Sequence, residues 1–167
     1  MENKINFAFF GTDNFSVGVL NELKKADLLP KIIITSPDKP KGRGLKLTPT
    51  PVKLWALANK IDFLQPTKLD DNFVLEIRNL KLEIGIVASY GKILPTATLK
   101  SFPRGLLNVH PSLLPKYRGA SPIQAQILND EKKIGMTIIL MDEKMDHGSV
   151  LAQRELKITN SKSQVPN

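Results

Sequence analysis

The chain contains no cysteine and only two histidines among its 167 residues. The absence of cysteine excludes disulfides and thiolate metal ligands, and two histidines far apart in the sequence supply too few ligands for a zinc site. No apolar run approaches the ~20 residues that a membrane-spanning helix needs, and the opening residues, MENK, do not begin a signal peptide. We therefore expect a cytoplasmic protein that binds no metal and no membrane.

The glycine motif of dinucleotide-binding folds is also absent. An apolar run over residues 5–10 predicts a buried strand, but it leads into Gly11-Thr12-Asp13-Asn14 and not into G-x-G-x-x-G. Apolar residues at helical spacing follow this turn. The alternation continues with strands expected at 32–35, 61–64, 84–91 and 105–110, helices after Pro51 and from Asp70, and a hairpin of strands at 135–141 and 149–156. This order predicts an α/β fold, with a doubly wound, mostly parallel sheet flanked by helices.

Positive charge dominates the composition, with a formal net charge of +8. Such a balance favours a polyanionic partner, although a lysine-rich proteome explains it equally well. The charge gathers in residues 36–51, which hold four prolines, two glycines and four basic residues, Lys39, Lys41, Arg43 and Lys46. We expect a long exposed loop inside the domain, and we prefer a loop that follows phosphates over a solvated linker.

Polar residues appear where the strand at 105–110 ends. Successive side chains of a strand point to opposite faces, so Asn108 and His110 share one face while Val109 takes the other. Pro111 then ends the strand because it has no N–H to donate. Taken alone, an N-x-H triplet is more often a pair of turn-capping residues than a site. In an open α/β sheet, however, this edge is where ligands bind.

The longer string LLNVHPSLLPKYRGASPIQ, residues 106–124, resembles the signature of the folate-dependent formyltransferases, and most closely that of the methionyl-tRNA formyltransferases among them. Its elements are N-x-H, S-L-L-P, a basic–aromatic pair, R-G and a small-residue P-I. The resemblance runs from about Asn3 to Leu156. It implies a Rossmann-like formyltransferase fold and transfer of a formyl group from 10-formyltetrahydrofolate to the amino group of methionyl initiator tRNA.

The resemblance also implies roles for residues outside this string. Asp146 falls on the catalytic aspartate of a D-x-x-x-D-x-G loop, where plain turn chemistry would otherwise explain an aspartate and a glycine. We expect His147 beside it to be a loop side chain without a chemical role. Segment 36–51 resembles the inserted loop that engages the acceptor arm of tRNA in the family. The residues implied in folate binding are Tyr90, Ile93 and Leu94 of Y-G-x-I-L-P, together with Ser112, Leu113, Leu114 and Pro115.

The three predicted catalytic residues suit transfer of a formyl group to an amine, which needs no enzyme nucleophile. The Asn108 amide is a donor for a tetrahedral oxyanion. His110, when protonated, donates as well and acts as a general acid. Asp146 within reach would favour the imidazolium and take up a proton, directly or through water.

The domain organisation and two alternatives stay open at this stage. We expect residues 1–156 to form one catalytic domain with segment 36–51 inserted, followed by a polar tail at 157–167, as a monomer without the family's C-terminal β-barrel. The chain is either a fragment or a naturally shortened protein. One alternative is a formyltransferase for a small amine, such as an amino-sugar nucleotide or glycinamide ribonucleotide, which would not need the basic segment. The other is a folate- or RNA-binding remnant without turnover, favoured by the short C-terminus and opposed by the intact catalytic positions.

Overall fold

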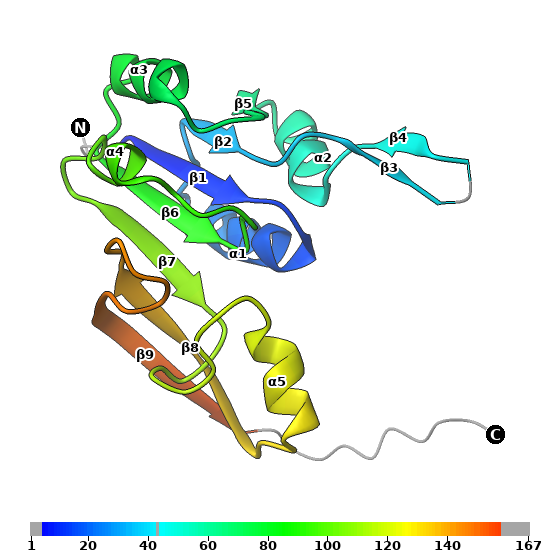
Figure 1. The fold of residues 1–167 in the computed structure, drawn as a ribbon, viewed down its shortest axis with the longest axis vertical. Helices are drawn as coiled ribbons and strands as arrows, with labels where there is room; N and C mark the ends of the chain where they lie inside the picture. Colours follow the sequence, from blue (N-terminus) through cyan, green and yellow to red (C-terminus); the bar gives the residue numbers. More distant parts are fainter. Residues whose placement is uncertain (1–4, 43, 158–167) are drawn as a thin grey trace.

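A computed structural model describes residues 5–42 and 44–157 (Figure 1). Seven strands form one sheet in the order β5-β2-β1-β6-β7-β8-β9. The strands are β1 (Phe7–Gly11), β2 (Ile32–Ile34), β5 (Phe63–Leu64), β6 (Ile84–Ala88), β7 (Leu106–His110), β8 (Lys133–Leu140) and β9 (Ser149–Lys157). The first five strands in this order, from β5 to β7, are parallel to one another. Strand β8 is antiparallel to β7, and β9 is antiparallel to β8. The expectation of an α/β fold with a mostly parallel sheet is confirmed.

Five helices accompany this sheet, and several begin at a side-chain cap. The helices are α1 (Asn14–Lys25), α2 (Pro51–Ala58), α3 (Asp71–Asn79), α4 (Thr96–Leu99) and α5 (Pro122–Leu128). The Asp13 carboxylate accepts a hydrogen bond from the Ser16 N–H at the start of α1. Thr50 and Asp70 do the same for α2 and α3. These caps satisfy amide donors that lack partners inside a helix.

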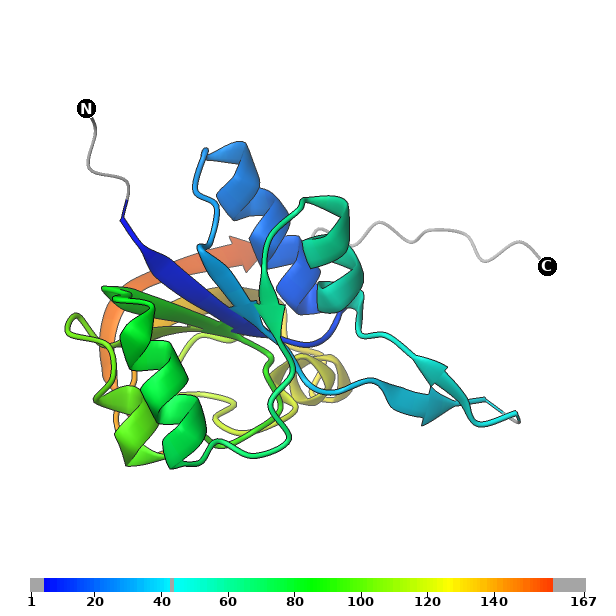
Figure 2. The same cartoon turned by 90° about the horizontal axis from the view of Figure 1, so that it is seen from above.

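Helices cover both faces of the parallel strands, as Figures 1 and 2 show. Neighbouring residues of β1 supply both layers because strand side chains alternate. Phe10 lies in one core cluster, which includes residues of α3, and Phe9 lies in the other, which includes Leu20 of α1 and Trp55 of α2. Burial on both faces explains why the central strands are continuous apolar runs.

Segment 36–51 contains a β-hairpin, so the expectation of a long loop was wrong. Strand β3 (Lys39–Lys41) pairs antiparallel with β4 (Lys46–Thr48), and the hairpin extends away from the domain (Figures 1 and 2). Gly42 at its turn has a φ of 75°, a conformation that glycine adopts without steric cost. Arg43, one of the four basic residues singled out from the sequence, lies outside the described residues.

The expected C-terminal hairpin is confirmed, with β8 between β7 and β9. Gly135 of β8 lies so close to its neighbours that a Cβ would collide with the Arg154 carbonyl and the Leu113 side chain. Gly18 on α1 has open space around it instead. Residues 158–167, which hold most of the expected polar tail, lie outside the described part. Among the residues described, no helix is long and apolar enough to span a bilayer.

Candidate active site

A cavity of about 470 Å³ opens where β6 and β7 end. Its walls come from four connections: the turn after β1, the segment after β6, the β7–α5 loop and the β8–β9 loop. The carboxyl edge of parallel strands is the usual place for a ligand in such sheets. The lining includes six of the residues singled out from the sequence, which are Tyr90, Ile93, Leu94, Asn108, His110 and Asp146.

Asn108 and His110 converge on the carboxylate of Asp146. The Asn108 amide Nδ2 donates to Asp146 Oδ1 at 3.1 Å, and His110 Nδ1 lies 3.5 Å from the same oxygen. The His110 and Asp146 side chains are 5% and 9% exposed, so both lie largely out of solvent. The two-residue spacing on β7 therefore does bring an amide and an imidazole to one wall, and the β8–β9 loop brings a carboxylate against them.

Backbone geometry holds Asp146 in place. Its own φ is 50°, and its second oxygen, Oδ2, accepts from the Gly119 N–H at 2.8 Å. Gly148 closes the loop where a Cβ would collide with the Leu140 carbonyl. A non-glycine residue in the left-handed region costs of order 1–3 kcal/mol and is typical of functional sites. The carboxylate is thus fixed from two sides before any ligand arrives.

His147, the next residue, points elsewhere. Its Nδ1 lies 3.0 Å from Asp142 Oδ2, and about half of its side chain is exposed. Hydrogen bonds from His147 and then from the Lys144 backbone hold the pKa of Asp142 below its ordinary value. Within the described part of the chain, no group of three or more histidine and acidic side chains is placed to hold a metal ion.

The His110 ring has an acceptor on each side. Its Nε2 lies 2.9 Å from the Tyr117 carbonyl oxygen, while Nδ1 faces Asp146. A carbonyl accepts only, so Nε2 carries a proton. The doubly protonated imidazolium satisfies both neighbours at once. Tyr117 itself has a φ of 59°, in the left-handed region.

The segment after β6 supplies an apolar side of the cavity. Ile93 is 79% exposed and Leu94 is buried, and Met141 and Met145 add apolar surface from the β8–β9 loop. Tyr90 lines the cavity, yet its ring packs edge-on against Phe10 in the core. Burial raises the pKa of Tyr90 to about 12. A concave, mostly apolar wall with a few polar groups is typical of small-molecule sites.

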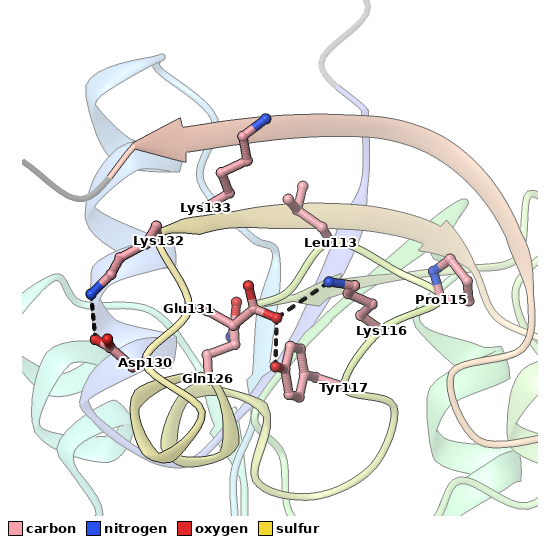
Figure 3. A pocket seen from close by; sticks show the side chains of 9 residues that line it. All are labelled: Leu113, Pro115, Lys116, Tyr117, Gln126, Asp130, Glu131, Lys132 and Lys133. Atoms are coloured by element: carbon pink, nitrogen blue, oxygen red, sulfur yellow. Dashed lines mark hydrogen bonds and ion pairs between the residues drawn. The ribbon is translucent and has the colours of Figure 1, made fainter.

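Residues 112–115 do not line this cavity. The Ser112 hydroxyl donates to the Lys116 carbonyl at 2.7 Å, and the Leu114 N–H donates to Thr137 Oγ1 at 3.1 Å. Leu113 and Pro115 line a second cavity, of about 550 Å³, which shares no lining residue with the first (Figure 3). A role in folate binding stays a prediction for these four residues, whose contacts in the structure shape the β7–α5 loop.

Three residues that line the cavity had no role assigned to them from the sequence, namely Asp13, Ser89 and Lys92. Ser89, with a φ of 48°, donates from Oγ to Asp13 Oδ2 at 2.6 Å, so the turns after β1 and β6 are joined. Lys92 Nζ donates to the Pro66 carbonyl at 2.7 Å. Burial, and then the charge of Lys39, hold the pKa of Lys92 below its ordinary value. The only sequence signal for these residues was their position after an apolar strand.

The basic hairpin does not line the cavity, although its base is tied to the domain. The residues Lys39, Lys41 and Lys46 are exposed along β3 and β4. At the base, Lys53 Nζ donates to Asp38 Oδ2 at 2.6 Å and Gln65 Nε2 donates to Asp38 Oδ1 at 2.7 Å. These contacts hold the pKa of Asp38 below its ordinary value, with Lys53 as the largest cause.

Known proteins resemble this chain in sequence, and solved structures resemble it in fold. The family described as formyl transferase matches residues 3–165. The methionyl-tRNA formyltransferase of Heliobacterium modesticaldum is 42% identical over 92% of this chain and 49% of its own length. That of Thermotoga maritima is 44% identical over 92% of this chain and 50% of its own length. The chain thus spans about half the length of these curated relatives.

The solved structures that resemble the chain show the same fold at low sequence identity. Phosphoribosylglycinamide formyltransferase from Bacillus halodurans superposes with a TM-score of 0.74 at 21% identity, over 95% of this chain and 82% of its own. A formyltetrahydrofolate deformylase from Pseudomonas syringae gives 0.72 at 18% identity, over 97% of this chain and 54% of its own. Because the family match covers nearly every residue, the chain belongs to the formyl transferase family.

Proposed function

We propose that the protein transfers the formyl group of 10-formyltetrahydrofolate to the amino group of methionyl initiator tRNA. The observation that carries the proposal is the convergence of Asn108 and His110 on Asp146 at the wall of the cavity. The relatives named methionyl-tRNA formyltransferase, 42–44% identical over 92% of this chain, support the choice of acceptor. We further propose that residues 1–156 act as the catalytic unit, as a monomer in the cytoplasm.

In the proposed reaction the acceptor amine, once deprotonated, attacks the formyl carbon. A tetrahedral intermediate forms, its oxygen becomes negatively charged, and the bond to the folate nitrogen then breaks as that nitrogen gains a proton. The enzyme must therefore stabilise an oxyanion, supply one proton and take up another. No covalent bond to the protein is involved.

Asn108 and His110 serve the oxyanion and the leaving nitrogen. The Asn108 Nδ2 carries two hydrogens, and one of them is engaged with Asp146. The other donates to the oxyanion. His110 is held at Nε2 by the Tyr117 carbonyl, so the proton on Nδ1, 3.5 Å from Asp146, is the one delivered to the leaving nitrogen. Loss of one oxyanion donor typically costs about 2.7–4 kcal/mol, or about 10²–10³ in kcat.

Asp146 orders both partners and takes part in proton transfer. Its Oδ1 faces both Asn108 and His110, and its Oδ2 is bound by the Gly119 N–H. The carboxylate lies where it can accept a hydrogen bond from a proton on His110 Nδ1, which orients the general acid. The same carboxylate accepts the proton that the attacking ammonium releases, directly or through water.

The cavity fits a reduced folate on its apolar side. Ile93, which is 79% exposed, offers surface for the pterin ring. A volume of about 470 Å³ lies within the range of cofactor sites, roughly 300–1,000 Å³. When bound, the folate supplies the activated formyl group. We assign residues 112–115 an indirect part, since their contacts shape the loop that carries the Tyr117 carbonyl.

The hairpin gives the reason to prefer tRNA over a small acceptor. Lys39, Lys41 and Lys46 place positive charge on a projecting ribbon, and the sequence has a fourth basic residue, Arg43, between Lys41 and Lys46. Such a ribbon suits contacts with a phosphate backbone. A small amine would not need it.

The test is a formyl-transfer assay with 10-formyltetrahydrofolate and methionyl initiator tRNA. We expect turnover by the wild-type chain and a loss of about 10²–10³ in kcat for Asn108→Ala and His110→Ala. Folate binding, followed by calorimetry, should survive in both variants. Folate binding without turnover in the wild type would refute the proposal and favour a non-catalytic remnant. Turnover only with an amino-sugar nucleotide or glycinamide ribonucleotide would refute the choice of acceptor.

The role of the hairpin is tested separately by salt dependence. A triple Lys→Ala variant at 39, 41 and 46 should lower the slope of log affinity for tRNA against log salt by about 2–3, while kcat at saturating tRNA changes little. A triple Lys→Ala variant at 24, 25 and 100, which are exposed lysines of other elements, is the matched control. An equal loss of slope in the control would show that net charge alone attracts the tRNA.

A further inference from the structure

The second cavity brings together the β7–α5 loop and the turn between α5 and β8 (Figure 3). At its centre the Tyr117 hydroxyl donates to Glu131 Oε1 at 2.7 Å, and Lys116 Nζ lies 3.3 Å from the same oxygen. The Glu131 N–H donates in turn to the Gln126 carbonyl at the end of α5. Glu131 is therefore fixed to the helix and holds the tip of the loop.

The charges around this cavity are matched within the protein. Lys116 pairs with Glu131, Lys132 Nζ lies 2.6 Å from Asp130, and Lys133 Nζ lies 3.5 Å from Glu155. A site for a charged ligand would leave some of these groups to that ligand. The paired arrangement points instead to a structural purpose for the contact between Tyr117 and Glu131.

That purpose follows from the backbone carbonyl of Tyr117. Its carbonyl oxygen lies 2.9 Å from His110 Nε2, and its φ of 59° places its backbone in the left-handed region. A residue in the left-handed region holds its conformation only where its surroundings determine it. The hydrogen bond to Glu131 is a side-chain anchor on this residue, and it lies in the second cavity, which shares no lining residue with the first.

We propose that Tyr117 and Glu131 form a positioning pair that fixes the His110 ring through the Tyr117 carbonyl. Glu131 holds the Tyr117 side chain, the held backbone aims its carbonyl at Nε2, and Nδ1 then faces Asp146 and the cavity. Neither residue touches a substrate. The kinetic part of this inference rests on the proposed function, whereas the orientation of the ring does not.

The hydrogen bond between Tyr117 and Glu131 also shifts the pKa of both side chains. The hydrogen bond is the largest cause of a raised pKa at Tyr117 and of a lowered pKa at Glu131. Each partner thus stabilises the other in the state that maintains the bond, a neutral phenol and a carboxylate.

Gln126 holds the two ends of the β7–α5 loop together, because its Nε2 donates to the carbonyls of Pro111 and Pro122.

The test uses the two histidines of the chain, labelled with ¹⁵N in the imidazole rings. The proton on His110 Nε2 should exchange slowly in the wild type because it is buried and hydrogen-bonded. We expect its exchange to accelerate at least about tenfold in Tyr117→Phe and in Glu131→Ala. Glu131→Gln should restore slow exchange, since its amide oxygen still accepts from the phenol. Lys116→Ala is the matched control and should leave exchange unchanged.

Kinetics supply the second readout. In Tyr117→Phe and Glu131→Ala, kcat should fall about 10- to 100-fold while the KM for folate stays within about threefold. Wild-type exchange rates in both variants would overturn the inference, as would an equal effect in Lys116→Ala. Absence of turnover in the wild type would instead contradict the proposed function, and the exchange experiment would still decide on the positioning pair.

Discussion

Tyr90 carries a buried hydroxyl whose removal should stabilise the protein. The residue is 2% exposed, and its ring makes an edge-on contact with Phe10 at a centroid distance of 5.5 Å. Among the described residues, the phenol oxygen has no hydrogen-bond partner. Burying a hydroxyl without a partner costs about 1–3 kcal/mol in proteins. Tyr90→Phe keeps the ring contacts and removes that cost.

The expected gain is about 1–2 kcal/mol in the free energy of unfolding near neutral pH, because the missing oxygen leaves a small void behind. For a chain of this size such a gain raises Tm by roughly 3–6 °C. The KM for folate should stay within about twofold. The reason is that the phenol oxygen is buried, although other atoms of Tyr90 line the cavity.

The effect of Tyr90→Phe should also grow with pH. Burial raises the pKa of Tyr90 from its ordinary 10.0 to about 12. Below pH 10 both the folded and unfolded chains hold the phenolic proton. Between pH 10 and pH 12 the unfolded chain releases it and the folded chain keeps it, so the wild type loses stability as pH rises. The advantage of the variant should increase by about 1 kcal/mol between pH 10 and pH 11.

Urea unfolding of the wild type and the variant at pH 8, 10 and 11 measures both effects, and lysine ionisation cancels in the difference. The chain has two tyrosines, so Tyr117→Phe leaves Tyr90 as the sole source of tyrosinate absorbance. Tyr117→Phe also serves as the opposite control, because it breaks the bond to Glu131 and should destabilise. A loss of stability in Tyr90→Phe, or a difference that is flat with pH, would refute the reasoning.

Three further predictions concern stability and the surroundings of the site. Gly135→Ala should lower the free energy of unfolding by about 1–3 kcal/mol through the strand collision described above, whereas Gly18→Ala should raise it by about 0.5–1 kcal/mol; urea unfolding that ranked them the other way would contradict the packing. His147→Asn should leave kcat within about twofold and raise the pKa of Asp142 toward its ordinary value, as carboxyl-carbon NMR would show. The lowered pKa of Asp38 contributes stability that is present above its ordinary 3.8 and lost as pH falls through the lowered value, so the deficit of Asp38→Asn against the wild type should shrink in acid unfolding.

Periodicity predicted the strands and the shared face of Asn108 and His110, because a two-residue repeat needs no knowledge of distant contacts. Asp146 could not be found that way. It lies 38 residues beyond Asn108, after a helix and a strand, and only the resemblance to a family indicated it. The Gly119 N–H and the Tyr117 carbonyl escaped altogether, since any residue carries these backbone groups and only the conformation of the loop aims them.

Two errors in the elements have physical causes. The hairpin within 36–51 was mistaken for a loop because proline is depleted in strands. Pro40 nevertheless lies in β3, which pairs with β4 on one side only, so a residue without an N–H is tolerated there. The strand expected at 84–91 ends at Ala88, because Ser89 turns into the left-handed region to reach Asp13. Local propensity favoured extension there, and a tertiary hydrogen bond overrode it.

The place of Asp146 in the β8–β9 loop makes the site vulnerable to partial opening. Strand β9 is the last strand of the sheet and exposes Val150 and Leu151. Edge elements with few buried apolar contacts separate at a lower free energy than the centre of a domain. Loss of this hairpin would withdraw the carboxylate from Asn108 and His110 while the parallel strands stayed folded. Heating should therefore abolish catalysis before the helical signal declines, and amide protons of β9 should exchange sooner than those of β1 and β6.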